Sequence, residues 1–296
     1  MNEMEALCGR YGAHPDATAY LTKAFETLQA NKAAYEVFLR QVQVYKNDYL
    51  FDHKPVMEAL RGLEEPTGIG WATIHLLYTL YLLPTLEDLY QKENIEEERF
   101  WDFVGNLRGS LGPGKEVYGL RTAWWFMDFF KLKLFTVGRL QYRRRRFRQD
   151  TVCGEQVFPE NSYYLDVHIP GGGSLKKELC QDSYKRAAAF YKKRFGDENI
   201  VIGCYSWLLS PDLDALLPES ANILAFAHQY TLTETVPDEG FDFLDYAFGI
   251  HGKPEDLNTL PENSSLQRAL KAWLLEGNIL RLGKGYFRYD ELTEER

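Results

Sequence analysis

One segment, residues 163–175, limits the folds open to this chain more than any other. It reads YYLDVHIPGGGSL, which is typical of a strand, a turn of three glycines and the start of a long helix. Such a unit gathers unpaired backbone N–H groups around one point, at the positive end of the helix dipole. The segment therefore predicts a phosphate or pyrophosphate site, built from Gly171, Gly172, Gly173, Ser174 and Leu175.

His168 ends the predicted strand, one short turn away from this anion site. Its imidazole titrates near neutral pH and suits a general base, although a strand-end histidine also serves simply as a backbone hydrogen-bonding partner. Asp166 shares a strand face with His168, where it either orients the imidazole or is a capping or solvated group. Ser174 either caps the following helix, binds phosphate, or does both.

The charge pattern argues against nucleic acid and membranes as partners. The formal net charge is −9 at pH 7, and a run of arginines, residues 143–148, would alternate between the two faces of a strand. We expect ion pairs there, with an arginine at the phosphates of a ligand as an open alternative. The most apolar run, residues 69–83, is shorter than the roughly 20 residues that span a bilayer.

The cysteines and histidines predict neither disulfides nor a metal site. The four cysteines are scattered without a CxxC pair, and the histidines lack metal-binding spacings. Reduced thiols and an N-terminus without a signal-peptide pattern predict a cytoplasmic protein.

Near Lys131 the sequence changes from helical patterns alone to strand patterns mixed with helical ones. This change predicts a helical domain over residues 1–131 and a second domain over 132–296. The first domain shows helical spacing of apolar residues, and its last helix is expected over 118–130. The second domain mixes strands with helices. Its expected strands are 134–147, 163–169, 200–207, 223–235, 241–248 and 285–289, and its expected helices are 175–195, 211–217 and 264–276.

The order strand, glycine turn, long helix, strand resembles the core of the GNAT acyltransferases. The matching parts are Leu165–Ile169, the turn, Leu175–Phe195 and Ile200–Trp207. In that family the turn cradles the pyrophosphate of coenzyme A, and the pantetheine arm enters between two strands that splay apart.

More closely, the chain resembles a bacterial family of acyltransferases with a helical N-terminal domain and a GNAT-like C-terminal domain. The resemblance lies in five blocks that occur in order between about residues 133 and 290: 137–142, 168–175, 206–209, 264–268 and 283–286. It implies an α+β or α/β fold, in which a helical bundle precedes a GNAT-like domain whose mixed, splayed sheet is flanked by helices.

Two features depart from the GNAT pattern. The turn has Pro170 and three consecutive glycines in place of Gln or Arg alternating with glycines, and residues 211–217 lack the tyrosine that protonates the leaving thiolate. Ser206 is the candidate to assist the thiolate instead, unless it is a satisfied polar core residue. Cys204 faces the same side, but no neighbouring group is placed to lower the pKa of its thiol and make it a nucleophile. Tyr205, on the opposite face, is expected to pack.

The resemblance implies transfer of an acyl group from acyl-CoA or acetyl-CoA to an unidentified acceptor, with an amine as the expected attacking group. His168 and Ser206 are the predicted catalytic residues, and residues 171–175 the predicted donor-binding residues. The alternative is an acyl-CoA-binding or regulatory module that keeps the fold without turnover. A third possibility, an adaptor that binds through the helical domain, has only the aromatic content of 15% in its favour.

Overall fold

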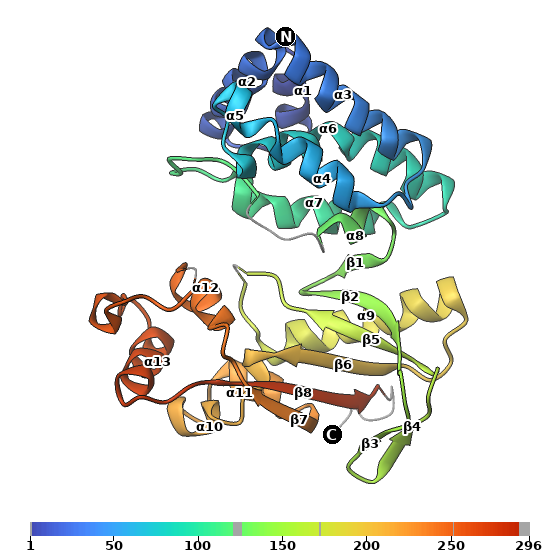
Figure 1. The fold of residues 1–296 in the computed structure, drawn as a ribbon. Helices are drawn as coiled ribbons and strands as arrows, with labels where there is room; N and C mark the ends of the chain where they lie inside the picture. The colour runs from blue at the N-terminus through green and yellow to red at the C-terminus, as the bar shows by residue number, and fades with distance from the viewer. Residues whose placement is uncertain (1, 121–125, 172, 251, 290–296) are drawn as a thin grey trace. The chain divides into compact units, whose positions relative to one another are not determined.

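The structure, a computed structural model, describes residues 2–120, 126–171, 173–250 and 252–289. The chain divides into two compact units, Met1–Phe135 and Thr136–Arg296. The first unit contains helices and the second a mixed sheet with helices on its flanks (Figure 1). The sequence-based α+β fold class is thus confirmed.

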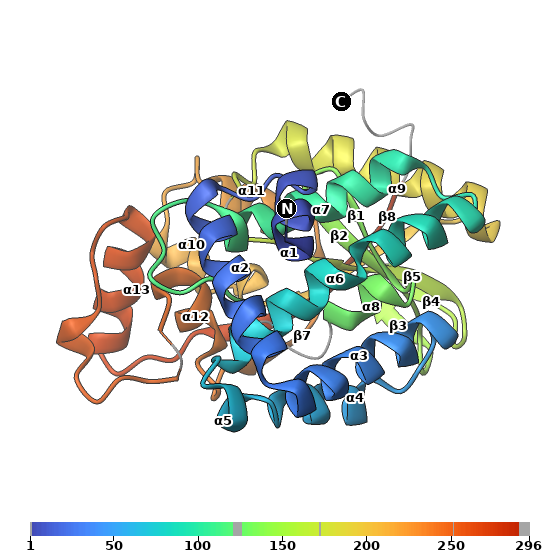
Figure 2. The same cartoon turned by 90° about the horizontal axis from the view of Figure 1, so that it is seen from above.

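The first unit is organised around one apolar helix, α6, which contacts α1, α2, α3, α4 and α7 (Figure 2). Most of its residues are buried, as expected for a helix that is apolar on nearly every face. The helices of this unit are α1 (Glu3–Arg10), α2 (Pro15–Ala30), α3 (Lys32–Asn47), α4 (His53–Arg61), α5 (Glu64–Thr67), α6 (Trp71–Lys92), α7 (Glu97–Leu111) and α8 (Met127–Phe130).

The helix predicted over 118–130 is only partly present. Residues 118–120 are not helical, 121–125 lie outside the described residues, and α8 begins at Met127. Gly119 packs so closely on Ala72 that a Cβ atom would lie 2.7 Å from the alanine Cβ. The Leu120 N–H donates to the Ala72 carbonyl at 2.8 Å. Tertiary contacts with the start of α6 therefore replace the local helix.

A six-stranded mixed sheet, in the order β1-β2-β5-β6-β8-β7, forms the second unit. Strands β5 and β6 are parallel and are joined by α9, whereas β2 and β8 run antiparallel to their inner neighbours. Strands β3 and β4 form a separate hairpin. The strands are β1 (Leu134–Val137), β2 (Leu140–Arg146), β3 (Thr151–Cys153), β4 (Gln156–Phe158), β5 (Tyr163–His168), β6 (Val201–Ser206), β7 (Thr231–Pro237) and β8 (Arg281–Arg288).

Two predicted strands were wrong in part, and a third was wrong throughout. The strand over 134–147 is a hairpin, since Gly138 turns the chain with φ of 63° between β1 and β2. Residues 223–235 hold helix α11 (Asn222–Ala227) before β7, and residues 241–248 form helix α12 (Asp242–Phe248). In α12 the adjacent Phe243 and Leu244 are both buried, which a strand with alternating faces cannot achieve on a half-covered sheet.

Helix α9 (Lys177–Phe195) covers one face of the sheet. Tyr142 of β2 contacts the Ser183 hydroxyl at 2.8 Å, and the Tyr191 hydroxyl donates to the Tyr142 carbonyl at 2.7 Å. The β3–β4 hairpin covers part of the other face, where aromatic residues form a core. In that core the rings of Tyr164 and Tyr286 meet edge to face with centroids 5.3 Å apart.

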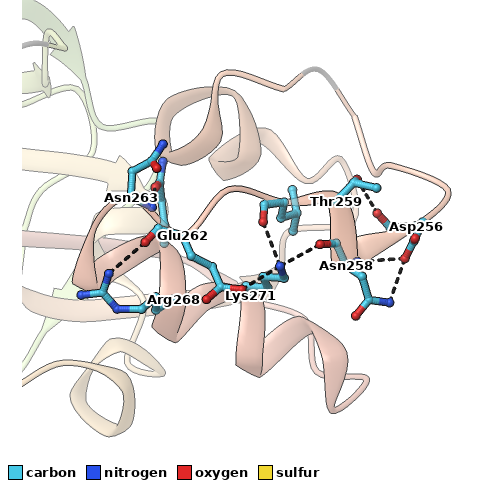
Figure 3. Close-up of polar contacts among 9 residues, drawn as sticks. Asp256, Asn258, Thr259, Glu262, Asn263, Arg268 and Lys271 are labelled. Atoms are coloured by element: carbon cyan, nitrogen blue, oxygen red, sulfur yellow. Dashed lines mark hydrogen bonds and ion pairs between the residues drawn. The ribbon is translucent and has the colours of Figure 1, made fainter.

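The remaining helices of the unit gather beyond the end of the sheet opposite the β3–β4 hairpin (Figure 1). They are α10 (Leu213–Leu216), α11, α12 and α13 (Ser265–Leu275), with short 3-10 helices at Trp207–Leu209 (η2) and Leu257–Thr259 (η3). Ser264 and Gln267 form a capping box on α13. The Lys271 ammonium binds the Asn258 and Leu260 carbonyls at 2.8 and 2.9 Å and the Glu262 carboxylate at 2.8 Å (Figure 3). Lys271 thus attaches the loop that precedes α13 to this helix.

Gly203 allows the aromatic core to close over the middle of the sheet. A Cβ atom at this position would lie 2.7 Å from the Tyr286 ring and 2.8 Å from the Tyr164 ring. We expect Gly203→Ala to lower the free energy of unfolding by about 1–3 kcal/mol through overpacking, measured by urea denaturation.

Gly171→Ala is the matched control, because no described residue other than its chain neighbours lies within 4 Å of the added Cβ. Equal stabilities of the two variants would contradict the packing role of Gly203.

Candidate active site

The two parallel strands at the centre of the sheet part near their carboxyl ends. The β5–β6 pairing runs from Leu165 and Ile202 to Val167 and Cys204, where it ends. Each strand nevertheless stays paired with its outer neighbour, β5 with β2 as far as His168 and β6 with β8 as far as Ser206. The strands therefore splay, and the opening lies at the end of the sheet where the glycine turn follows β5.

His168 stands at the mouth of this opening. Its side chain is 29% exposed, and its Nε2 lies 3.6 Å from Oδ2 of Asp166. Burial, together with the smaller effect of the nearby Arg143 and Arg145 charges, lowers the pKa of His168 to about 4. The imidazole is consequently neutral at physiological pH, which is the form that can accept a proton.

Asp166 is ion-paired rather than solvated or capping. Its side chain is 14% exposed, and Oδ2 lies 2.8 Å from Nε of Arg145. Burial raises the pKa of this carboxyl, while the charges of Arg145, Arg143 and Lys284 oppose that rise. Capping and solvation, two of the alternatives left open by the sequence, do not fit these contacts. Asp166 lies beside the imidazole, yet the pKa of His168 is lowered rather than raised.

The arginine run alternates between the two faces, as expected for a strand. On the face covered by α9, Arg144 forms two hydrogen bonds with Asp197, at 2.8 and 2.6 Å. On the other face Arg145 reaches Asp166. The prediction of ion pairs in this run is confirmed.

The glycine turn is exposed at Gly171, Gly173 and Ser174, and Gly172 lies outside the described residues. The amides of Gly171, Gly173, Ser174 and Leu175 donate to no residue that the structure describes. Helix α9 begins at Lys177, two residues later than expected, with no side-chain cap. The Ser174 hydroxyl instead accepts from Nδ2 of Asn222 at 3.4 Å. The capping role considered for Ser174 was therefore wrong.

Ser206 ends β6 and caps η2, since its hydroxyl oxygen accepts from the Leu208 N–H at 3.1 Å. Strand alternation places Ser206 with Cys204 on the α9 face, and His168 with Asp166 on the opposite face. The two predicted catalytic residues thus flank the opening from different sides of the sheet. Burial raises the pKa of the Cys204 thiol well above its usual range, which leaves Cys204 unsuited to nucleophilic catalysis.

Sequence reasoning missed two residues near the opening. Tyr205, expected to pack, is 52% exposed and shares the face of His168. Arg139, in the β1–β2 turn, donates to the carbonyls of Gly173 and Ser174. The only sequence signal for Arg139 was its place in the block 137–142, which carried the family resemblance without indicating a role.

Comparisons with known proteins agree with this architecture. Residues 134–287, a little more than half of the chain, match the family described as a GNAT-like C-terminal domain. Residues 2–132 match the family described as an N-acyltransferase N-terminal domain. The fold and these matches define an acyltransferase-type protein. The chain belongs to the GNAT-like family with this N-terminal domain, as the resemblance implied.

Several solved structures share the fold. A crystal structure of an acyltransferase in complex with decanoyl-CoA is 23% identical, with a TM-score of 0.71 over 97% of this chain and 88% of that chain. A crystal structure of an acyltransferase in complex with decanoyl-CoA and teicoplanin is 22% identical, with a TM-score of 0.60 over 97% and 99% of the two chains. No curated protein matches the chain.

Two other kinds of feature are absent from the described part of the chain. No cluster of three or more His, Cys, Asp or Glu side chains there could hold a metal ion. None of the helices described is long and apolar enough to cross a membrane.

The low pKa of His168 makes a prediction about stability. The unfolded chain takes up the proton near pH 6.5, whereas the folded protein does so only near pH 4. Folding stability should therefore be lost as the pH falls from about 6.5 to 4, by up to about 3 kcal/mol from this group.

Denaturation of the wild type and His168→Gln over pH 4–8 measures this contribution, because the glutamine does not titrate. The wild type should lose stability relative to the variant as the pH falls. A difference that stays constant across this range would contradict the burial of a neutral imidazole.

Proposed function

We propose that this protein transfers an acyl group from acyl-CoA to an amine acceptor by direct attack, without an acyl-enzyme intermediate. The observation that carries the proposal is the parting of β5 from β6 after Val167 and Cys204, next to a glycine turn whose described amides donate to no described residue. A thioester arm that enters this opening would lie beside His168. The structural neighbours bind decanoyl-CoA and CoA, which supports an acyl-CoA donor here.

The donor would be held at the turn, with its pyrophosphate on the amides of residues 171–175. Four of these residues are described, and their amides donate to no described residue. Backbone N–H groups in such a turn are strong donors to phosphate oxygens. The uncapped start of α9 adds the partial positive charge of its dipole.

His168 would accept the proton that the amine loses. The amine attacks the thioester carbonyl, an N–C bond forms, and the C–S bond breaks. The attacking nitrogen becomes acidic once it is bonded to the carbonyl carbon, so a base with a low pKa suffices to take its proton. The imidazole is in the required neutral form because burial holds its pKa at about 4.

Ser206 would assist the departing thiolate from the other face of the sheet. Its oxygen already accepts from the Leu208 N–H, so its O–H remains available to donate to sulfur before solvent supplies a proton. Placement of His168 and Ser206 on opposite faces fits a thioester that passes between the strands, since such a ligand meets both faces.

The alternative function is an acyl-CoA-binding or regulatory module without turnover. The helices that follow β6, α10 and α11, contain no tyrosine. Tyr230, just beyond α11, is buried with its hydroxyl 3.0 Å from that of Tyr184. Binding is common to both functions, and the release of free CoA distinguishes them.

We further propose that residues 1–131 and 132–296 act as separate domains. The cysteines that the structure describes are all free and buried, which supports a reducing compartment and our proposal of a cytoplasmic location.

Calorimetric titration with acyl-CoA esters of increasing chain length tests the donor. We expect saturable binding of at least one ester, in competition with free CoA. Absence of binding for every ester would contradict the proposed function and its alternative alike.

His168→Ala should lower the rate of CoA release, measured with a library of amines, by about 10²–10⁴-fold without weakening acyl-CoA binding. His228→Ala is the matched control, because His228 lies at the end of α11 and pairs with Asp214 on the surface. Saturable binding without any CoA release in the wild type would favour the binding module. Equal rates of release in the wild type and His168→Ala would remove His168 from catalysis.

A further inference from the structure

The side chain of Arg139 joins the β1–β2 turn to the glycine turn. Its Nη2 donates to the Gly173 carbonyl at 2.8 Å, and its Nε donates to the Ser174 carbonyl at 3.0 Å. Two donors of one rigid, planar guanidinium thus bind two successive carbonyls. This contact fixes the orientation of both peptide planes.

The contact between Arg139 and the two carbonyls also orients two backbone N–H groups. In a trans peptide the C=O and the following N–H point in opposite directions, and the described peptide bonds are all trans. The N–H groups of Ser174 and Leu175 share their planes with the carbonyls that Arg139 holds. Both N–H groups therefore point away from the guanidinium, and neither donates to a described residue.

The absence of a side chain at Gly173 leaves room for the guanidinium of Arg139. A Cβ atom there would lie 3.0 Å from Nε and 3.3 Å from Cζ of Arg139. This close approach of the guanidinium explains the glycine at position 173.

We propose that Arg139 is a positioning residue for the acyl-CoA donor, which aims the amides of Ser174 and Leu175 at the donor's pyrophosphate. This inference rests on the proposed function. Arg139 acts through the two peptide planes and does not touch the phosphates. Its charge also polarises both peptides, which strengthens their N–H groups as donors.

The test compares the binding of three ligands to the wild type and Arg139→Met by calorimetry. Coenzyme A and 3′-dephospho-CoA carry the pyrophosphate, whereas S-decanoylpantetheine has no phosphate. We expect the Kd to rise about tenfold for the first two ligands. For S-decanoylpantetheine it should change by less than about twofold, since the acyl chain and pantetheine arm bind elsewhere.

Two further variants refine the test. Arg139→Lys should show an intermediate loss, because an ammonium lacks the planar fork that holds both carbonyls. Arg148→Met is the matched control, as the seven residues of β2 separate it from Arg139 by roughly 25 Å. If Arg139→Met does not fold, Gly173→Ala displaces the guanidinium instead and should weaken binding of the two pyrophosphate ligands.

Three results would overturn the inference. Wild-type affinity of Arg139→Met for coenzyme A would remove the role outright. An equal loss for S-decanoylpantetheine would indicate a general structural role. A loss for coenzyme A but not for 3′-dephospho-CoA would mean that Arg139 contacts the 3′-phosphate. Failure of the wild type to bind coenzyme A would instead remove the proposed function itself.

Discussion

Two neighbouring strands stay hydrogen-bonded only while their backbones run about 4.8 Å apart. Strands β5 and β6 keep this spacing for three residue pairs and then separate, although each remains paired with its outer neighbour. The outer ladders and the packing of α9 make this separation a fixed feature of the sheet. The positions of His168, Ser206 and the glycine turn relative to one another all follow from it.

The face of the sheet that carries His168 is rich in positive charge. Arg143, Arg145 and Lys284 act on Asp166, and the two arginines also act on the imidazole. These cations and burial both favour the neutral form of His168. An anionic acyl-CoA donor bound nearby would act in the opposite direction and make His168 a stronger base. The occupied site would thus have a better general base than the free protein.

The glycine turn shows how a distant residue completes a local motif. The sequence segment 163–175 predicts a strand, a turn and a helix, but the orientation of the turn's amides depends on Arg139 from another hairpin. Gly173 makes room for that arginine. A glycine in such a turn can therefore serve the approach of a side chain as well as an unusual backbone conformation.

Much of the fold could be predicted from local patterns. The apolar run of α6, the strand β5 and the long helix α9 each carry a clear periodicity or a strong turn signal. The β1–β2 hairpin was missed because Gly138 was the only turn-forming residue in a continuous run of strand-forming residues. The helix α12 was mistaken for a strand because aromatic residues favour both readings over so short a segment.

Within the site, the sequence indicated His168, Ser206 and the turn, all of which lie on consecutive elements of one local motif. It did not indicate that His168 and Ser206 face opposite sides, because the register of β5 against β6 decides this. Nor did it indicate Arg139 or the Arg145–Asp166 pair, because both depend on tertiary contacts between strands. Spacing along the chain carries no information on such contacts.

A crystal structure with a bound acyl-CoA is the most direct test of this account. We expect the pyrophosphate on the amides of Ser174 and Leu175, the pantetheine arm between β5 and β6, and the thioester carbonyl within reach of His168. A ligand bound elsewhere, with the space between the two strands filled by side chains, would contradict it.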